Sequence, residues 1–224
     1  MPRDLQWRVH GTIVPIPKER EDAVRFAALA ANRRSTWRDL TLNIFSDASF
    51  QRQHNVGGYA VVHRPLVPSD DGGGSDGGSE GDGGFVEVAW PIDPLPDSNL
   101  GEMLAIAESL AVAIQQVGDN RAALMGKRVN ITIFSDSNGS LQVLSENKMS
   151  DRLWTLVFPV ARFIRTQFQL LGQLGPTVHL VFRWMPGHYH DIFPHVRADE
   201  LSRNTGLMRL SYTNAHRNLN LWEY

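Results

Sequence analysis

The sequence contains no cysteine and no long apolar run. Without cysteine the chain has no disulfide framework, no zinc site with cysteine ligands and no cysteine nucleophile. No uninterrupted apolar stretch approaches the roughly 20 residues that cross a bilayer. We therefore expect a soluble chain without a membrane partner, in an intracellular and reducing compartment. The sequence does not distinguish between the nucleus, the cytoplasm and the mitochondrion.

What the sequence does contain is the composition of one globular domain. Of its 224 residues, 42% are hydrophobic and 21% charged, which excludes a coiled coil or a wholly disordered chain. Ser69–Gly84 holds eight glycines, five acids and three serines, and this composition predicts a disordered acidic loop. Without those acids, 22 basic side chains face 19 acidic ones. This mildly basic remainder permits a polyanionic partner without requiring one.

The hydrophobic pattern predicts an α/β domain, residues 40–206, between two less informative ends. An extension at residues 1–39 contains one expected helix, Lys18–Arg34, and is a candidate contact for a protein partner. Residues 207–224 form a tail without a clear pattern. The expected strands are Leu40–Phe45, Tyr59–His63, Phe85–Ile92, Val129–Phe134 and Val178–Trp184, and the expected helices are Asn99–Val117, Ser137–Leu144, Asp151–Leu171 and a short one at Val196–Asn204. This order indicates a five-stranded mixed sheet, an antiparallel meander plus parallel strands, flanked by helices.

Two carboxylates lie where strands of this sheet are expected to end. Asp47 follows the first strand and Asp136 follows the fourth, and a mixed sheet can place these two strands side by side. Each also has a purely structural interpretation. Asp47 suits a turn, and Asp136 suits the cap of a helix that begins at Ser137.

Two further carboxylates belong to expected helices packed beside those strands. Glu102 lies in the first turn of the long helix, where Asn99 and Glu102 together fit a capping box. Asp199 lies in the last helix, four residues before Arg203, at the spacing of an exposed ion pair. Taken singly, none of the four acids indicates catalysis.

Taken in order, the segments around these acids resemble the type 1 ribonuclease H family. The matching segments are IFSDAS at Ile44–Ser49, NLGEMLAIAESL at Asn99–Leu110, FSDSNGSLQVL at Phe134–Leu144, and WMPGH with RADELSR between Trp184 and Arg203. The resemblance extends over roughly Leu40–Gly206. The layout of extension and domain is also similar to ribonuclease H domains of fungal retroelements.

This resemblance implies a ribonuclease H-like fold and a metal-dependent endonuclease. Such an enzyme hydrolyses the RNA strand of an RNA–DNA hybrid and leaves 5′-phosphate and 3′-hydroxyl ends. Asp47, Glu102, Asp136 and Asp199 match the family's four carboxylate ligands for two Mg²⁺ ions, for which Mn²⁺ can substitute. His188 matches the loop histidine that assists proton transfer, although a polar loop residue bonded to backbone is the alternative.

The resemblance also implies the residues that contact the hybrid. Backbone groups near Ser49 and Gly101, with the side chain of Asn99, match readers of the RNA 2′-hydroxyl. For Asn99, a plain helix cap is an equal alternative. His195 stands where the family commonly has an asparagine that contacts the substrate backbone. A catalytically silent module of the same fold, serving as a nucleic-acid-binding or protein-interaction scaffold, is the alternative function.

Overall fold

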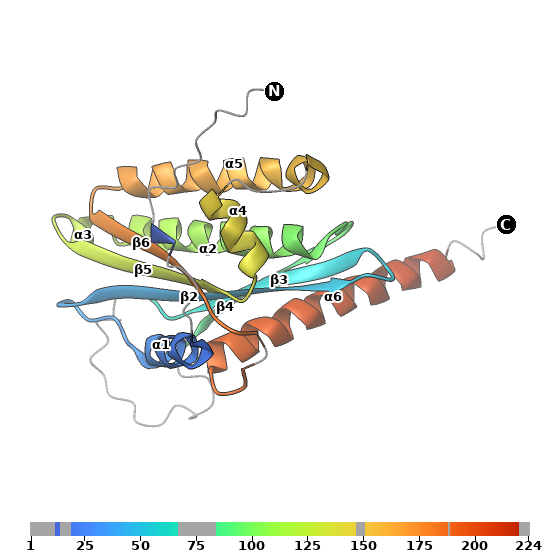
Figure 1. The fold of residues 1–224 in the computed structure, drawn as a ribbon, viewed down its shortest axis with the longest axis horizontal. Helices are drawn as coiled ribbons and strands as arrows, with labels where there is room; N and C mark the ends of the chain where they lie inside the picture. The colour runs from blue at the N-terminus through green and yellow to red at the C-terminus, as the bar shows by residue number, and fades with distance from the viewer. Residues whose placement is uncertain (1–11, 14–18, 67–83, 147–150, 188, 220–224) are drawn as a thin grey trace.

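A computed structural model of the chain describes residues 12–13, 19–66, 84–146, 151–187 and 189–219. The expected acidic loop lies, except for Gly84, outside these residues, and so does His188. The described part forms one mixed sheet with helices on both faces (Figure 1).

The sheet has six strands in the order β1-β6-β5-β2-β3-β4. Their bounds are β1 (Thr12–Ile13), β2 (Leu40–Gln51), β3 (Val56–His63), β4 (Val86–Ile92), β5 (Arg128–Ser135) and β6 (Thr177–Trp184). The first four in this order pair in parallel, and β2, β3 and β4 form an antiparallel meander. The five expected strands are therefore confirmed. The sixth, β1, was not predicted, because two residues are too few to show an alternating pattern.

Most of the hydrophobic core lies between the sheet and the helices on one face. These helices are α2 (Ser98–Asp119), α3 (Arg121–Leu124), α4 (Asn138–Glu146) and α5 (Asp151–Gln173). Along β2, Leu40, Leu42 and Ile44 turn every second side chain toward the buried residues of α2. By length and composition α2 is apolar enough to cross a membrane, but 56% of its most apolar window is buried in this core.

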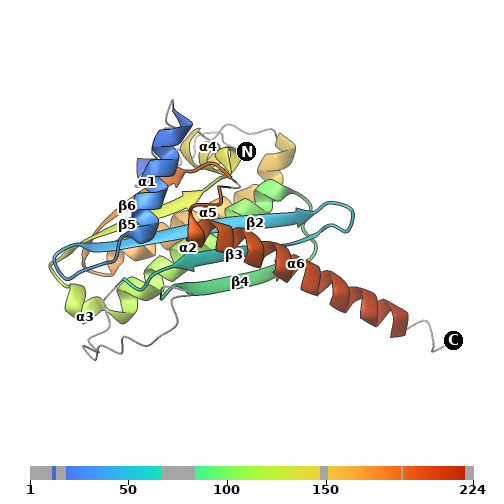
Figure 2. The ribbon, with the colours of Figure 1, turned by 90° about the horizontal axis from the view of Figure 1, so that it is seen from below.

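The opposite face of the sheet carries α1 (Arg20–Asn32) and α6 (Phe193–Leu219), which both lie in front of the sheet in Figure 2. Ala27, Ala30 and Ala31 of α1 are buried against aromatic rings of β2 and β5 and against Met185 and Ile192 of the loop after β6. The small alanine side chains allow the helix to lie close to the sheet. The expected helix of the extension is confirmed, and it packs on this domain. A contact between the extension and a protein partner remains a prediction.

The expectation of a short last helix, Val196–Asn204, was wrong, while the end of the domain at position 206 stays a prediction. α6 has 27 residues and continues past that position beyond the sheet (Figure 1). The exposed fractions of Leu207 and Met208 are 46% and 73%. A helical segment that does not pack on a core needs no apolar stripe, so periodicity does not reveal it.

Candidate metal centre

The site begins where the parallel pairing of β2 and β5 ends. The last paired residues are Phe45 and Phe134, whose rings stack with centroids 4.7 Å apart. The Ser46 hydroxyl donates a hydrogen bond to the Phe134 carbonyl oxygen at 2.9 Å and holds the strands together at this point. Asp47 and Asp136 each follow two residues after the last pair. Because side chains alternate along a strand, this spacing directs both acids to the side of the stacked rings.

Asp47 lies within a strand rather than at its end. β2 continues to Gln51, and Asp47 is paired with Ala60 of β3. Its side chain is buried, with an exposed fraction of 5%. The turn interpretation is therefore wrong.

Glu102 comes to the same place from the second turn of α2, which begins at Ser98 rather than at Asn99. The cap of this helix is Asp97, whose Oδ1 accepts hydrogen bonds from the backbone N–H of Asn99 at 2.8 Å and from its side-chain amide at 3.0 Å. The capping box expected for Asn99 and Glu102 does not form. The Ala48 N–H donates a hydrogen bond to the Glu102 carboxylate. The second oxygen, Oε2, is buried and has no hydrogen-bond partner among the described residues.

Asp136 follows directly after β5, and it does not cap the next helix. The Ser137 hydroxyl takes that role by accepting the Ser140 N–H at 3.2 Å. The Trp184 indole N–H donates to the Asp136 carbonyl oxygen at 3.0 Å and ties this residue to the end of β6. Gly187 lies so close that a Cβ at this position would overlap the Asp136 carboxylate.

Asp47, Glu102 and Asp136 form one group, which we call the acid triad. One carboxylate oxygen from each residue lies within 4.8 Å of the other two. Oxygens at this spacing, supplied by three separate elements, can share one divalent cation. Of the four acids predicted as ligands, the two at strand ends and one of the two on helices are thus brought together.

Burial and mutual repulsion dominate the electrostatics of the triad. Burial first, and then the negative charge of Asp136, raise the pKa of Asp47 from 3.8 to about 7, although a hydrogen bond from Ser202 and the charge of Arg203 oppose the rise. Burial and the charges of Asp47 and Asp136 raise the pKa of Glu102 well above its ordinary value. A bound cation would relieve both causes, because it neutralises the charges that burial leaves poorly solvated.

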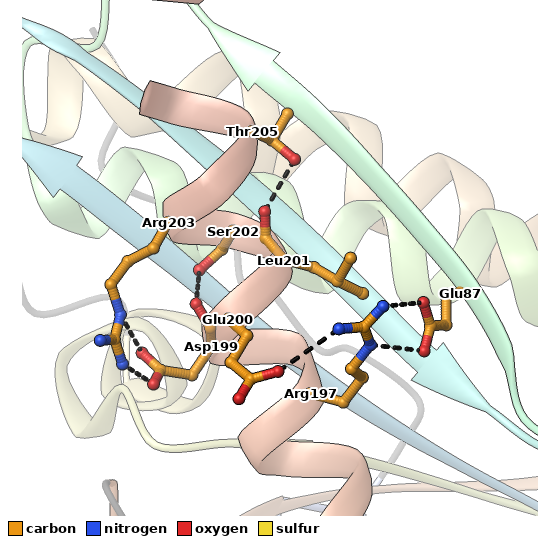
Figure 3. A network of polar contacts seen from close by, with 8 residues as sticks. All are labelled: Glu87, Arg197, Asp199, Glu200, Leu201, Ser202, Arg203 and Thr205. Carbon is orange, nitrogen blue, oxygen red and sulfur yellow. Dashed lines mark hydrogen bonds and ion pairs between the residues drawn. The ribbon is translucent and has the colours of Figure 1, made fainter. Parts of the chain in front are cut away.

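The fourth predicted acid, Asp199, lies near the triad but not in it. It belongs to α6 and forms a two-point ion pair with Arg203, the i+4 pair that the spacing allowed (Figure 3). Ser202 of the same turn joins this helix to the triad, since its hydroxyl lies 2.8 Å from Asp47 Oδ2 and 3.0 Å from the Asp199 carbonyl oxygen. No sequence pattern indicates a role for Ser202 beyond its place in the RADELSR segment.

α6 can reach Asp47 because its backbone lies directly on β3. A Cβ at Gly58 would overlap the Ser202 carbonyl oxygen, and Gly206 packs on Gly57 in the same way. Only glycine allows so close an approach of helix and strand. The glycine contacts therefore set the distance over which Ser202 reaches Asp47.

The predicted substrate contacts divide into two groups. Ser49, Gly101 and Asn99 lie close to the triad, on β2 just past Asp47 and in the first turn of α2. Ser49 is buried, as is Gly101, while Asn99 is half-buried. His195 lies in the first turn of α6 with an exposed fraction of only 1%, so its ring offers a substrate no surface to contact.

Comparison with known proteins gives structural matches alone. No family model and no curated protein matches the sequence. The N-terminal ribonuclease H domain of a Mycobacterium tuberculosis protein, solved as a fusion with maltose-binding protein, is 15% identical, with a TM-score of 0.48 over 78% of this chain and 99% of that one. Ribonuclease H1 of the halophilic archaeon Halobacterium salinarum is 20% identical, with a TM-score of 0.44 over 75% and 98%.

Both solved structures are named as ribonuclease H proteins. The α/β class and mixed sheet expected from the sequence are those of the described fold. At these identities and TM-scores we transfer neither residue roles nor an activity from either structure to this chain.

Proposed function

We propose that this chain is a divalent-cation-dependent nuclease that hydrolyses the RNA strand of an RNA–DNA hybrid. The observation that carries the proposal is the convergence of Asp47, Glu102 and Asp136 from a strand, a helix and the end of a second strand. Bringing one buried and two half-buried acids together costs stability, and an enzyme that needs a cation at this point offers a reason for it.

The donor set of the triad suits a hard cation. All of its ligand atoms are carboxylate oxygens, which Mg²⁺ and Mn²⁺ prefer. Glu102 Oε2, buried and lacking a hydrogen-bond partner among the described residues, is an acceptor for which a cation would supply the missing partner. Asp47, Glu102 and Asp136 would hold the ion, and Asp199 would join them for a second one. The bound ions would supply an activated water and stabilise the leaving 3′ oxygen, so that the products carry 5′-phosphate and 3′-hydroxyl ends.

The chain's own residues would orient the site and read the substrate. The Ser202 hydroxyl holds one oxygen of Asp47, and the Ala48 N–H holds Glu102. Backbone groups near Ser49 and Gly101, with the side chain of Asn99, would contact the RNA 2′-hydroxyl, which distinguishes RNA from DNA in the minor groove. His188 would move a proton at the leaving group.

The direct test incubates the full chain with a labelled RNA–DNA hybrid, an RNA duplex and a DNA duplex, each with Mg²⁺ and with EDTA. We expect cleavage of the hybrid alone, only with Mg²⁺, and a loss of more than about 100-fold in Asp136→Asn. Asp191→Asn, an exposed acid in the loop after β6, is the matched control and should cleave normally.

A folded protein that binds the hybrid without cutting it would overturn the proposal. That result would favour the silent scaffold, in which the Asp199–Arg203 pair leaves the fourth acid permanently occupied.

A further inference from the structure

Arg203 lies at the edge of the proposed site and covers its fourth acid. Its Nε donates to Asp199 Oδ1 at 3.1 Å, and its terminal nitrogen pairs with Oδ2 (Figure 3). The Asp199 side chain is 18% exposed, whereas that of Arg203 is 51% exposed. The guanidinium therefore lies on the solvent side of the carboxylate and would have to leave before Asp199 could bind a cation.

A second arginine of the same helix shows what a structural ion pair looks like here. Arg197 donates to both oxygens of Glu87, at 2.7 and 3.0 Å, and to Glu200 at 3.3 Å, so it ties α6 to β4. Arg203 makes its two hydrogen bonds to Asp199 within one helical turn, and these bonds connect no second element. Exposed pairs at i and i+4 add little to stability, so this pair can be exchanged at small cost.

The geometry of the Arg203 fork also suits the proposed substrate. A guanidinium binds a carboxylate and a phosphodiester with the same two parallel N–H donors. The turn that carries Arg203 is anchored to the triad through the bond from Ser202 to Asp47. A nucleic-acid backbone bound across the triad would therefore bring a phosphate to the guanidinium.

We propose that Arg203 is a phosphate-binding residue. In the free protein its guanidinium pairs with the Asp199 carboxylate, and on substrate binding it leaves this carboxylate and pairs with a phosphate of the substrate. Asp199 would then become available as a carboxylate ligand only when the substrate is bound. By thermodynamic linkage, substrate would raise cation affinity at this acid, and cation would raise substrate affinity. This inference rests on the proposed nuclease function and adds a substrate-binding residue to it.

The first experiment measures binding of MnCl₂ to the full chain by calorimetry, without nucleic acid. We expect Arg203→Ala to bind Mn²⁺ about fivefold more tightly than the natural chain, or at one additional site, because Asp199 is uncovered. The double variant Arg203→Ala with Asp199→Asn should lose this gain. Arg197→Ala removes a positive charge from the same helix and should change Mn²⁺ affinity by less than about twofold, since it pairs with acids outside the triad.

The second experiment measures binding of a fluorescent RNA–DNA hybrid by anisotropy in EDTA, where no cleavage takes place. Arg203→Ala should weaken binding about fivefold and lower the salt dependence of binding by about one phosphate contact. Arg203→Lys should recover part of the affinity, because it keeps the charge but not the fork.

The outcomes separate this inference from the proposed function. Unchanged Mn²⁺ and hybrid binding in Arg203→Ala, with normal cleavage of hybrids by the natural chain, would overturn the role of Arg203 alone. Tighter Mn²⁺ binding in Arg203→Ala, with no cleavage by the natural chain, would support the inference that Arg203 blocks Asp199 and would overturn the proposed nuclease function.

Discussion

Glu102 and Glu200 are glutamates on two helices of one domain, and their surroundings differ. Glu200 is exposed on the outer side of α6 and pairs with Arg197, which also binds Glu87 of β4. Glu102 has a buried oxygen without a hydrogen-bond partner among the described residues, and two more acids lie beside it. The first arrangement pairs opposite charges in water, and the second gathers like charges away from water.

The difference separates acids that stabilise the fold from acids that destabilise it. Exposed pairs such as Arg197 with Glu200 contribute between zero and about 1 kcal/mol each. The triad does the opposite, because burial and repulsion raise the pKa values of Asp47 and Glu102. A charge cluster that opposes folding is therefore the better candidate for a ligand site.

The largest expected effect comes from replacing each of the two glutamates by glutamine in a separate variant. Glu102→Gln removes a charged oxygen from the triad, so we expect Mn²⁺ affinity to fall about 100-fold, measured by calorimetry. Glu200→Gln removes only an exposed partner of Arg197 and should stay within about twofold of the natural chain. Equal Mn²⁺ affinities in the two variants would erase the distinction between the two regions.

A smaller effect is expected on stability, and it depends on pH. The pKa of Asp47 is raised from 3.8 to about 7 in the folded chain, so the unfolded chain releases this proton at lower pH. Stability should therefore fall as pH rises from about 4 to about 7 and stay low above that. Asp47→Asn carries no such charge, and its amide oxygen can still accept the Ser202 hydroxyl. In EDTA at about pH 8 we expect this variant to be more stable than the natural chain by about 2 kcal/mol in urea unfolding.

The same measurement has two built-in controls. At about pH 3, below the ordinary pKa of 3.8, the difference between Asp47→Asn and the natural chain should largely disappear, because Asp47 is then mostly protonated in both states. Addition of Mn²⁺ at about pH 8 should stabilise the natural chain more than the variant. If Asp47→Asn is the less stable protein in EDTA at about pH 8, the triad does not oppose folding.

The contrast between the regions also explains what could be predicted from the sequence. The five longer strands and the helices under the core have apolar stripes, because they bury one face, and those stripes were readable. The position of each acid relative to these elements allowed the acids to meet, but only the resemblance to the ribonuclease H family selected four of them as ligands, and the structure groups three of the four. β1 has only two residues, too few to show an alternation, and α6 continues past Gly206 with the exposed Leu207 and Met208, so both were missed.

Contacts between distant segments could not be predicted. The sequence spacing allowed the Asp199–Arg203 pair, but local alternatives such as the cap of α2 at Asp97 instead of Asn99 depend on rotamers and on neighbours brought by the fold. The bond from Ser202 to Asp47 joins residues 155 positions apart and requires the glycine contacts between α6 and β3. No local pattern records such a distance.

The smallest effect, a change in the shape of the site at constant charge, comes from Gly187. An added methyl group would overlap the Asp136 carboxylate and push it away from Asp47 and Glu102. We expect Gly187→Ala to lower Mn²⁺ affinity about fivefold in calorimetry, with little loss of stability because the loop is partly exposed. Gly172→Ala in α5 is the control: a Cβ there meets no atom within 4 Å, so it should leave Mn²⁺ affinity unchanged and stabilise the helix by up to about 1 kcal/mol. If the two variants bind Mn²⁺ equally well, the loop after β6 does not set the position of Asp136.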